Sequence, residues 1–163
     1  MAGKAAIITN DFRRATAAIY IVLPDSPGDL TMYYTVAVRD IYCSTRTSKT
    51  AAWANEKAFA PANNLGAVEH SPTPHANGNI MVFARTKSGG AGSADFYITY
   101  RNSKTNTWST PTNMREINRT GWDSNASFFD LTGQLYWSDW TSGAQPIVRC
   151  TCYKLASLFV DRH

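Results

Sequence analysis

The chain has 163 residues, about the length of one domain, which is enough to bury a core without disulfide bonds. Hydrophobic residues make up 44% of the chain and charged residues only 17%, against about 25% in typical domains. The 7 Phe, 8 Tyr and 5 Trp exclude a disordered chain, and the low charge disfavours a helical bundle, whose surface is normally rich in Glu and Lys. We therefore expect a β-rich globular protein.

The net charge of +4 comes from cations that are scattered along the chain. The densest groups are Arg13-Arg14 and the pair Arg85 and Lys87. Nucleic-acid-binding proteins concentrate Lys and Arg on one stripe or face. We therefore expect no specific nucleic-acid partner, and we interpret the charge as a solubility feature.

Strands are expected in chain order at a regular spacing, set by alternating apolar residues and by turn residues such as Asn77-Gly78. An N-terminal strand is expected over 5–10. Three groups of four strands follow, at 16–23, 30–38, 40–46 and 53–59, at 69–75, 79–86, 95–101 and 107–113, and at 123–129, 134–140, 146–153 and 155–160.

The three groups are related by an internal repeat. Residues 40–53 align with residues 95–108 at an offset of 55, and seven of the fourteen positions are identical. The same offset relates the short segment that begins at Gly78 to the one that begins at Gly133. In both, a glycine is followed by a polar and then an apolar residue, and an earlier copy of this segment begins at Gly28. Four strands in about 50 residues is the spacing of a β-propeller blade. The sequence thus predicts an all-β chain of three four-stranded antiparallel blades, over 14–62, 63–117 and 118–163, with 1–13 contributing an extra strand.

Three blades are too few to close a ring, because propellers have about four to eight. Either two chains join to make a six-bladed ring, or the chain is part of a longer propeller. The initiating Met and the extra N-terminal strand favour the first alternative, so we expect a homo-oligomer, most simply a dimer.

Residues between about 28 and 142 also resemble a known family of repeats. The resemblance is carried by Asp40, Tyr42, Arg46, Trp53, Pro61, Asn64-Leu65-Gly66, Ser71-Pro72, Asn77-Gly78, Phe83, Arg85, Gly89-Gly90, Gly92 and Asp95-Phe96-Tyr97. This pattern is similar to the WD40-like β-propeller repeats of TolB-type proteins. The resemblance implies the blade fold but no particular activity. A fainter similarity to the Asp-box of sialidase-type propellers, at 48–53 and 103–108, lacks the aspartate and is interpreted as a shared turn.

Candidate ligand-binding residues follow from the expected position of the first strand of each blade, which would line the central channel. They are Arg13, Arg14, Glu69, His70, His75, Trp122, Asp123 and Asn125. A carboxylate, an arginine and an aromatic ring together suit a sugar or carboxylate ligand. In the alternative interpretation Glu69 and Asp123 only cap turns, and Trp122 belongs to the core.

We therefore expect a non-enzymatic module that binds a protein, peptide or glycan at the mouth of the central channel. A glycoside hydrolase with Glu69 and Asp123 as its carboxylates is the alternative. No cofactor or metal is expected, because His70 and His75 would point to opposite faces of a strand, and the glycine-rich stretch at 88–92 precedes a strand and not a helix.

The cysteines and the N-terminus bear on localisation. Cys43, Cys150 and Cys152 are an odd number, so they cannot all pair within the chain, and free thiols are typical of a reducing compartment. No apolar signal segment is visible, and the longest apolar run, 15–23, is too short to span a bilayer. The expectation is a cytoplasmic protein with no membrane partner.

Overall fold

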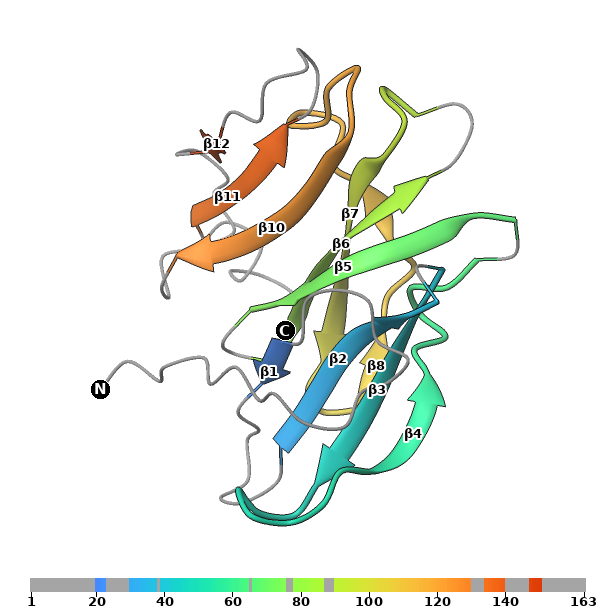
Figure 1. Cartoon of the computed structure of the whole chain (residues 1–163), viewed down its shortest axis with the longest axis vertical. Coiled ribbons are helices and arrows are strands. Elements are labelled where there is room, and N and C mark those ends of the chain that lie inside the picture. The colour runs from blue at the N-terminus through green and yellow to red at the C-terminus, as the bar shows by residue number, and fades with distance from the viewer. Residues whose placement is uncertain are drawn as a thin grey trace.

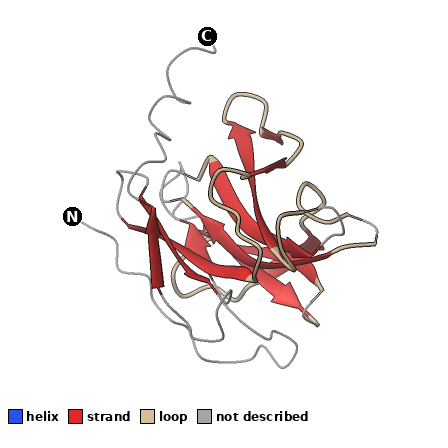
Figure 2. Ribbon diagram, turned by 90° about the horizontal axis from the view of Figure 1, so that it is seen from above, coloured by secondary structure: helices blue, strands red, loops and turns tan. Residues whose placement is uncertain are grey.

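The computed structural model describes residues 20–22, 30–37, 39–64, 66–75, 78–86, 90–129, 134–139 and 147–150. Within these ranges the chain forms strands and loops and no helix (Figures 1 and 2). The strands are β1 (Tyr20–Val22), β2 (Leu30–Val36), β3 (Asp40–Arg46), β4 (Ala54–Ala58), β5 (Val68–Pro74), β6 (Ile80–Thr86), β7 (Asp95–Asn102), β8 (Thr107–Trp108), β9 (Thr112–Asn113), β10 (Asp123–Phe129), β11 (Gln134–Asp139) and β12 (Ile147–Cys150).

These strands make three antiparallel sheets, each of which joins strands in the order in which they follow along the chain. The first sheet is β1-β2-β3-β4, the second is β5-β6-β7-β8 with β9 also beside β7, and the third is β10-β11-β12. In Figure 1 the second sheet lies between the first, at the bottom, and the third, at the top. The sheets are strongly twisted and include a curled half-barrel. The predicted all-β, antiparallel character is confirmed.

One expected strand is divided in two. The sequence predicts a single strand over 107–113, whereas the structure has β8 and β9 on either side of a break. Pro111 lies in that break and has no N–H to give to β7. The hydroxyl of Ser109 accepts a hydrogen bond from the Tyr100 N–H at 3.1 Å, which a regular ladder would direct to a backbone carbonyl. The expected strands at 5–10 and 155–160 lie outside the described residues.

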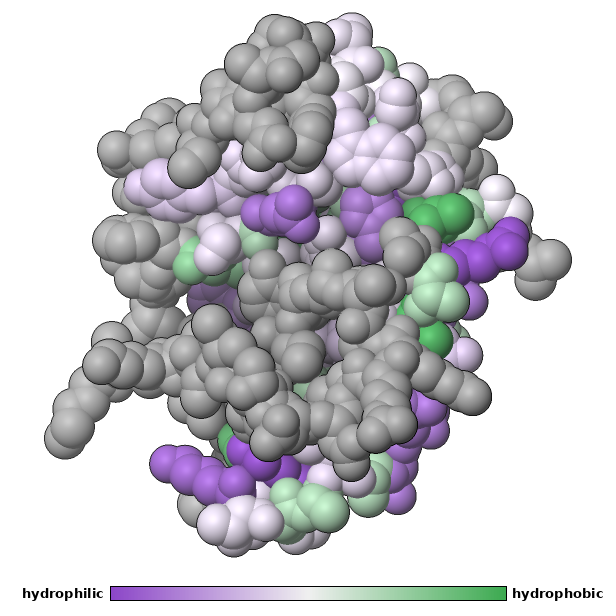
Figure 3. Space-filling view, viewed as in Figure 1, coloured by the Kyte–Doolittle hydropathy of each residue, from purple (hydrophilic) through white to green (hydrophobic). Residues whose placement is uncertain are grey.

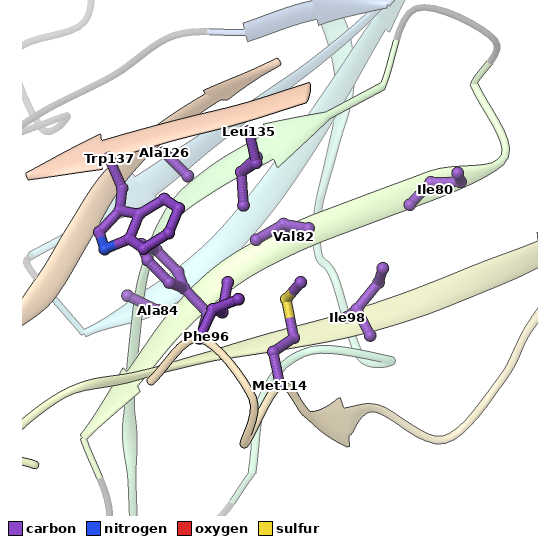
Figure 4. Packing of buried hydrophobic residues seen from close by; sticks show 10 residues of the cluster. Ile80, Val82, Ala84, Phe96, Ile98, Met114, Ala126, Leu135 and Trp137 are labelled. Carbon is purple, nitrogen blue, oxygen red and sulfur yellow. The ribbon is translucent and has the colours of Figure 1, made fainter. Parts of the chain in front are cut away.

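The core is divided between the two faces of the second sheet. Ile80, Val82 and Ala84 of β6 belong to one apolar cluster, which also takes in Leu135 and Trp137 of the third sheet (Figure 4). The intervening residues Met81 and Phe83 belong to a second cluster, together with Tyr33, Ile41 and Cys43 of the first sheet. Because both faces of β6 are covered, its sequence is a nearly continuous apolar run with no polar alternation.

The internal repeat is also present in the hydrogen bonds of the structure. The side chain of Asn63 accepts the Ile41 N–H at 2.9 Å and donates to the Ile41 carbonyl at 2.9 Å. At an offset of 55 residues, Asn118 accepts the Phe96 N–H at 2.7 Å and donates to the Phe96 carbonyl at 3.0 Å. Each side-chain amide thereby connects two parts of one sheet. It lies in the loop that follows the last strand of the sheet, and it binds the backbone of the third strand of the same sheet. Sequence reasoning missed these two asparagines, although both lie at the repeat offset.

Candidate functional site

Strands β5 and β10 carry four of the eight candidate residues, and each strand contains a β-bulge. The pairing register with the next strand shifts between His70 and Thr73 in β5, and between Ser124 and Ser127 in β10. Ser71 and Asn125 lie in these bulges, and both have a φ of 53°, which is uncommon for residues other than glycine. Bulges re-aim side chains and occur often beside functional sites.

The two bulges contact each other. The Ser71 hydroxyl donates to Asn125 Oδ1 at 3.2 Å, and the Thr73 hydroxyl donates to the Ala126 carbonyl at 2.9 Å. The Ser71 hydroxyl also lies 3.0 Å from Nδ1 of His70. A short polar chain therefore links His70 to Asn125 across the junction of the second and third sheets.

Trp122 stacks on His70 at the same junction. The ring centroids are 5.3 Å apart and the planes differ by 15°. His70 is 8% exposed, whereas Trp122, at 39%, is the one large hydrophobic side chain that is exposed among the described residues. The structure thus brings together three of the expected site residues, His70, Trp122 and Asn125, and adds Ser71. We refer to these four residues as the Trp122 platform.

The backbone on either side of Trp122 is fixed by several hydrogen bonds. Trp122 forms a parallel bridge with Ala94, and the Asp123 N–H donates to the Ala94 carbonyl at 3.1 Å. The Arg119 N–H donates to Asp123 Oδ2 at 2.8 Å. The Asp123 carboxyl group is fully buried and caps the turn that contains Trp122. This role is the one that the turn-capping interpretation expects for Asp123.

The glycine-rich loop before β7 binds a carboxylate of its own chain. The N–H groups of Ala91 and Gly92 donate to Asp95 at 3.0 and 3.1 Å, and the Asn113 amide donates to the same carboxylate at 3.0 Å. A Cβ on Gly92 would lie 2.1 Å from the Gly121 carbonyl oxygen and 2.5 Å from that of Arg119. Glycine is therefore required here by the close approach of the loop that carries Trp122.

We predict that Gly92→Ala lowers the free energy of unfolding by about 2–4 kcal/mol, because the added methyl group meets backbone that cannot move aside. Urea denaturation measures the change. Gly66→Ala is the matched control: its φ is +85° but its Cβ would meet nothing within 4 Å, so only backbone strain of about 1–2 kcal/mol is expected. Equal losses in the two variants would show that the contact with 119–121 is unimportant.

Glu69 lies at the start of β5, and no part of its side chain is exposed. Its Oε1 accepts a hydrogen bond from Nε of Arg85, the residue opposite on β6, at 2.8 Å. Arg85 also donates to the Ala62 carbonyl at 2.7 Å and lies over the Tyr97 ring at 4.4 Å. Burial raises the pKa of Glu69, although Arg85 and the backbone of Asn64 act in the opposite direction. This carboxyl group is therefore buried and ion-paired inside the protein.

The remaining expected residues lie elsewhere. His75 follows the end of β5, is 4% exposed and packs edge-on against Phe128, with ring centroids 5.0 Å apart. Arg13 and Arg14 lie outside the described residues. Cys43 is a buried free thiol, and burial raises its pKa, which disfavours the reactive thiolate. Cys152 is outside the described ranges.

The described residues lack two further features. They include no cluster of three or more His, Cys, Asp or Glu side chains arranged to hold a metal ion. They also include no helix with the length and apolar character needed to cross a membrane.

Stability should fall in mild acid because of His70. Burial lowers the pKa of His70 below its ordinary value of 6.5, so the folded state favours the neutral imidazole. The unfolded chain then binds the proton more tightly, and stability that is present above 6.5 is lost as the pH falls below it. We expect a lower free energy of unfolding at about pH 5.5 than at about pH 7.5, with a smaller difference in His70→Gln. An identical pH dependence in the variant would contradict this prediction.

The chain matches no protein-family model, and no curated protein is significantly similar to it. Its function is therefore inferred from its own residues and their geometry.

Proposed function

We propose that this protein is a non-enzymatic binding module of β-propeller type, which recognises a protein, peptide or glycan ligand close to the Trp122 platform. The observation that carries the proposal is the repeated unit. In each sheet the strands lie side by side in the order in which they follow along the chain. Asn63 and Asn118, which are 55 residues apart, bind the third strand of their own sheets in the same way. In a β-propeller, four-stranded antiparallel blades repeat around a central channel, and the contact that recurs at the repeat spacing supports such an arrangement for this chain.

The proposal includes oligomerisation, because three blades leave sheet faces and edges that a ring would cover. The simplest assembly has two chains and six blades. Light scattering on the purified protein is expected to give a mass of twice the 18.0 kDa of one chain. A stable monomer at every concentration measured would overturn the ring, and a larger assembly would overturn the two-chain version of it.

Binding without turnover is supported by the burial of the two carboxyl groups that the hydrolase alternative needs. Glu69 and Asp123 are both fully buried, Glu69 is paired with Arg85, and Asp123 caps a turn. A glycan and peptide array, followed by product analysis of each bound compound, tests this step. If the protein hydrolysed a bound compound, and if folded Glu69→Gln or Asp123→Asn variants lost this activity, the hydrolase alternative would replace the proposed binding function.

A further inference from the structure

The Trp122 platform combines a partly exposed indole, stacked on His70, with the polar side chains of Ser71 and Asn125. We propose that the Trp122 platform binds a neutral pyranose residue of a glycan, with the sugar ring stacked on the face of Trp122 opposite His70. The inference deepens the proposed binding function and rests on it. Of the three ligand classes in the proposed function, which are proteins, peptides and glycans, the inference selects glycans.

The Trp122 ring is held in place before any ligand arrives. His70 supports one ring face at a centroid distance of 5.3 Å, and the backbone behind it is tied to Ala94 and closely packed on Gly92. A ring fixed in this way loses little conformational freedom on binding, which favours affinity. A tryptophan that served only as core would be buried, whereas Trp122 is 39% exposed.

The charge of the platform favours a neutral ligand. Burial lowers the pKa of His70, so its imidazole is uncharged near neutral pH. Ser71 and Asn125 are uncharged as well. The platform therefore lacks the cation that would select an acidic sugar or a phosphate.

Asn125 supplies hydrogen-bonding capacity at the edge of the platform. Its side chain is exposed, and its Oδ1 is engaged by the Ser71 hydroxyl, which fixes the orientation of the amide. No described residue accepts a hydrogen bond from the amide nitrogen, and in the proposal its two N–H groups donate to a ligand oxygen. A sugar hydroxyl can accept such a bond while the C–H face of the ring packs on the indole.

The surroundings argue against a protein or proline-rich partner. Proline-rich segments dock into grooves lined by several aromatic rings, whereas Trp122 is the one large exposed hydrophobic side chain of the described residues. Exposed apolar patches of several hundred Å² or more mark many protein interaction sites. On the face drawn in Figure 3, the coloured hydrophobic areas are small and separate from one another. A single ring bordered by polar groups suits one sugar residue better.

Fluorine NMR of protein labelled with 5-fluorotryptophan tests the proposal directly, because each of the five tryptophans gives its own signal. The Trp122 signal is assigned as the one missing from Trp122→Phe. The probes are neutral trisaccharides of glucose, mannose, galactose and N-acetylglucosamine. We expect at least one of them to shift the Trp122 signal saturably, with a dissociation constant of about 0.1–10 mM, as is reasonable for one stacked ring.

Three variants make the test specific. Trp122→Ala should weaken binding at least about tenfold, and Asn125→Gly, which removes the amide but tolerates the φ of 53°, should weaken it several-fold. Trp53→Phe is the matched control, because this partly buried ring packs against Arg46 of the first sheet and should leave affinity unchanged. If Trp122→Ala fails to fold, Asn125→Gly and the NMR assignment still decide the outcome.

The outcomes separate this inference from the function on which it rests. No response to any neutral trisaccharide, or a stronger response to sialylated or phosphorylated sugars, would overturn the pyranose assignment. A response to a proline-rich or aromatic peptide in place of sugars would also overturn it, while leaving the binding module intact. A monomeric mass in solution would count against the propeller module whether or not a sugar binds.

Discussion

Replacing Glu69 with alanine is expected to lower the free energy of unfolding by about 3–5 kcal/mol, the largest effect that we predict for any single substitution in this chain. The variant leaves Arg85 as an unpaired charge whose side chain is only 8% exposed. The guanidinium group retains its hydrogen bond to the Ala62 carbonyl and its contact with the Tyr97 ring, but neither neutralises its charge. Urea denaturation followed by circular dichroism provides the measurement.

Two comparisons make this expectation specific. Glu116→Ala removes an exposed glutamate and should change stability by less than about 0.5 kcal/mol. The double variant Glu69→Leu/Arg85→Met, which removes both charges and preserves volume, should recover most of the loss, because buried ion pairs are often replaceable by apolar residues. A double variant as unstable as Glu69→Ala would show that the pair does more than neutralise charge.

Asn118→Ala is expected to destabilise the protein by about 2–4 kcal/mol, because three hydrogen bonds are lost and each contributes about 0.5–1.5 kcal/mol. Two of the bonds are those to the backbone of Phe96, and the third runs from the Asn118 amide to Asn113 Oδ1 at 2.9 Å. Asn63→Ala, which loses the two bonds to Ile41, should cost about 1–3 kcal/mol. The variants are compared by urea denaturation under identical conditions.

Asn64→Ala is the matched control, since Asn64 is the exposed neighbour of Asn63 and makes no side-chain hydrogen bond among the described residues. Its loss should be within about 0.5 kcal/mol. Asn118→Asp gives a finer test, because the acceptor for the Phe96 N–H remains while both donors disappear. If Asn118→Ala were no more destabilising than Asn64→Ala, the contact between this asparagine and the third strand would not contribute to stability.

The strands were predictable because their signals are local. The alternation in 95–101 and the hairpin residues at 77–78 act over a few positions, and β7 and β6 lie where they indicate. The repeat of 55 residues added a second signal, since one recognisable unit predicts the strands of the next. The break at Pro111 was missed because the repeat pattern extended the strand across a residue that cannot pair.

Residues of the candidate site were identified only one at a time. His70, Trp122 and Asn125 were proposed because they fall on or beside the first strands of two repeats, but nothing in the sequence indicated that an imidazole and an indole would stack. The bulge at Ser71 carries no glycine and thus gave no signal. The partner of Glu69 was missed as well, because Arg85 becomes its neighbour only through the register of β5 and β6.

The sequence by itself determined the all-β character of this protein, the order of its strands and the length of its repeat, since these depend on residue type and spacing over short stretches. Only the tertiary structure decided which face of each strand is buried, which carboxyl groups are withdrawn from solvent and which aromatic ring remains exposed. Those properties depend on the packing of one sheet against the next and on the removal of water between them. They join residues that no local pattern connects.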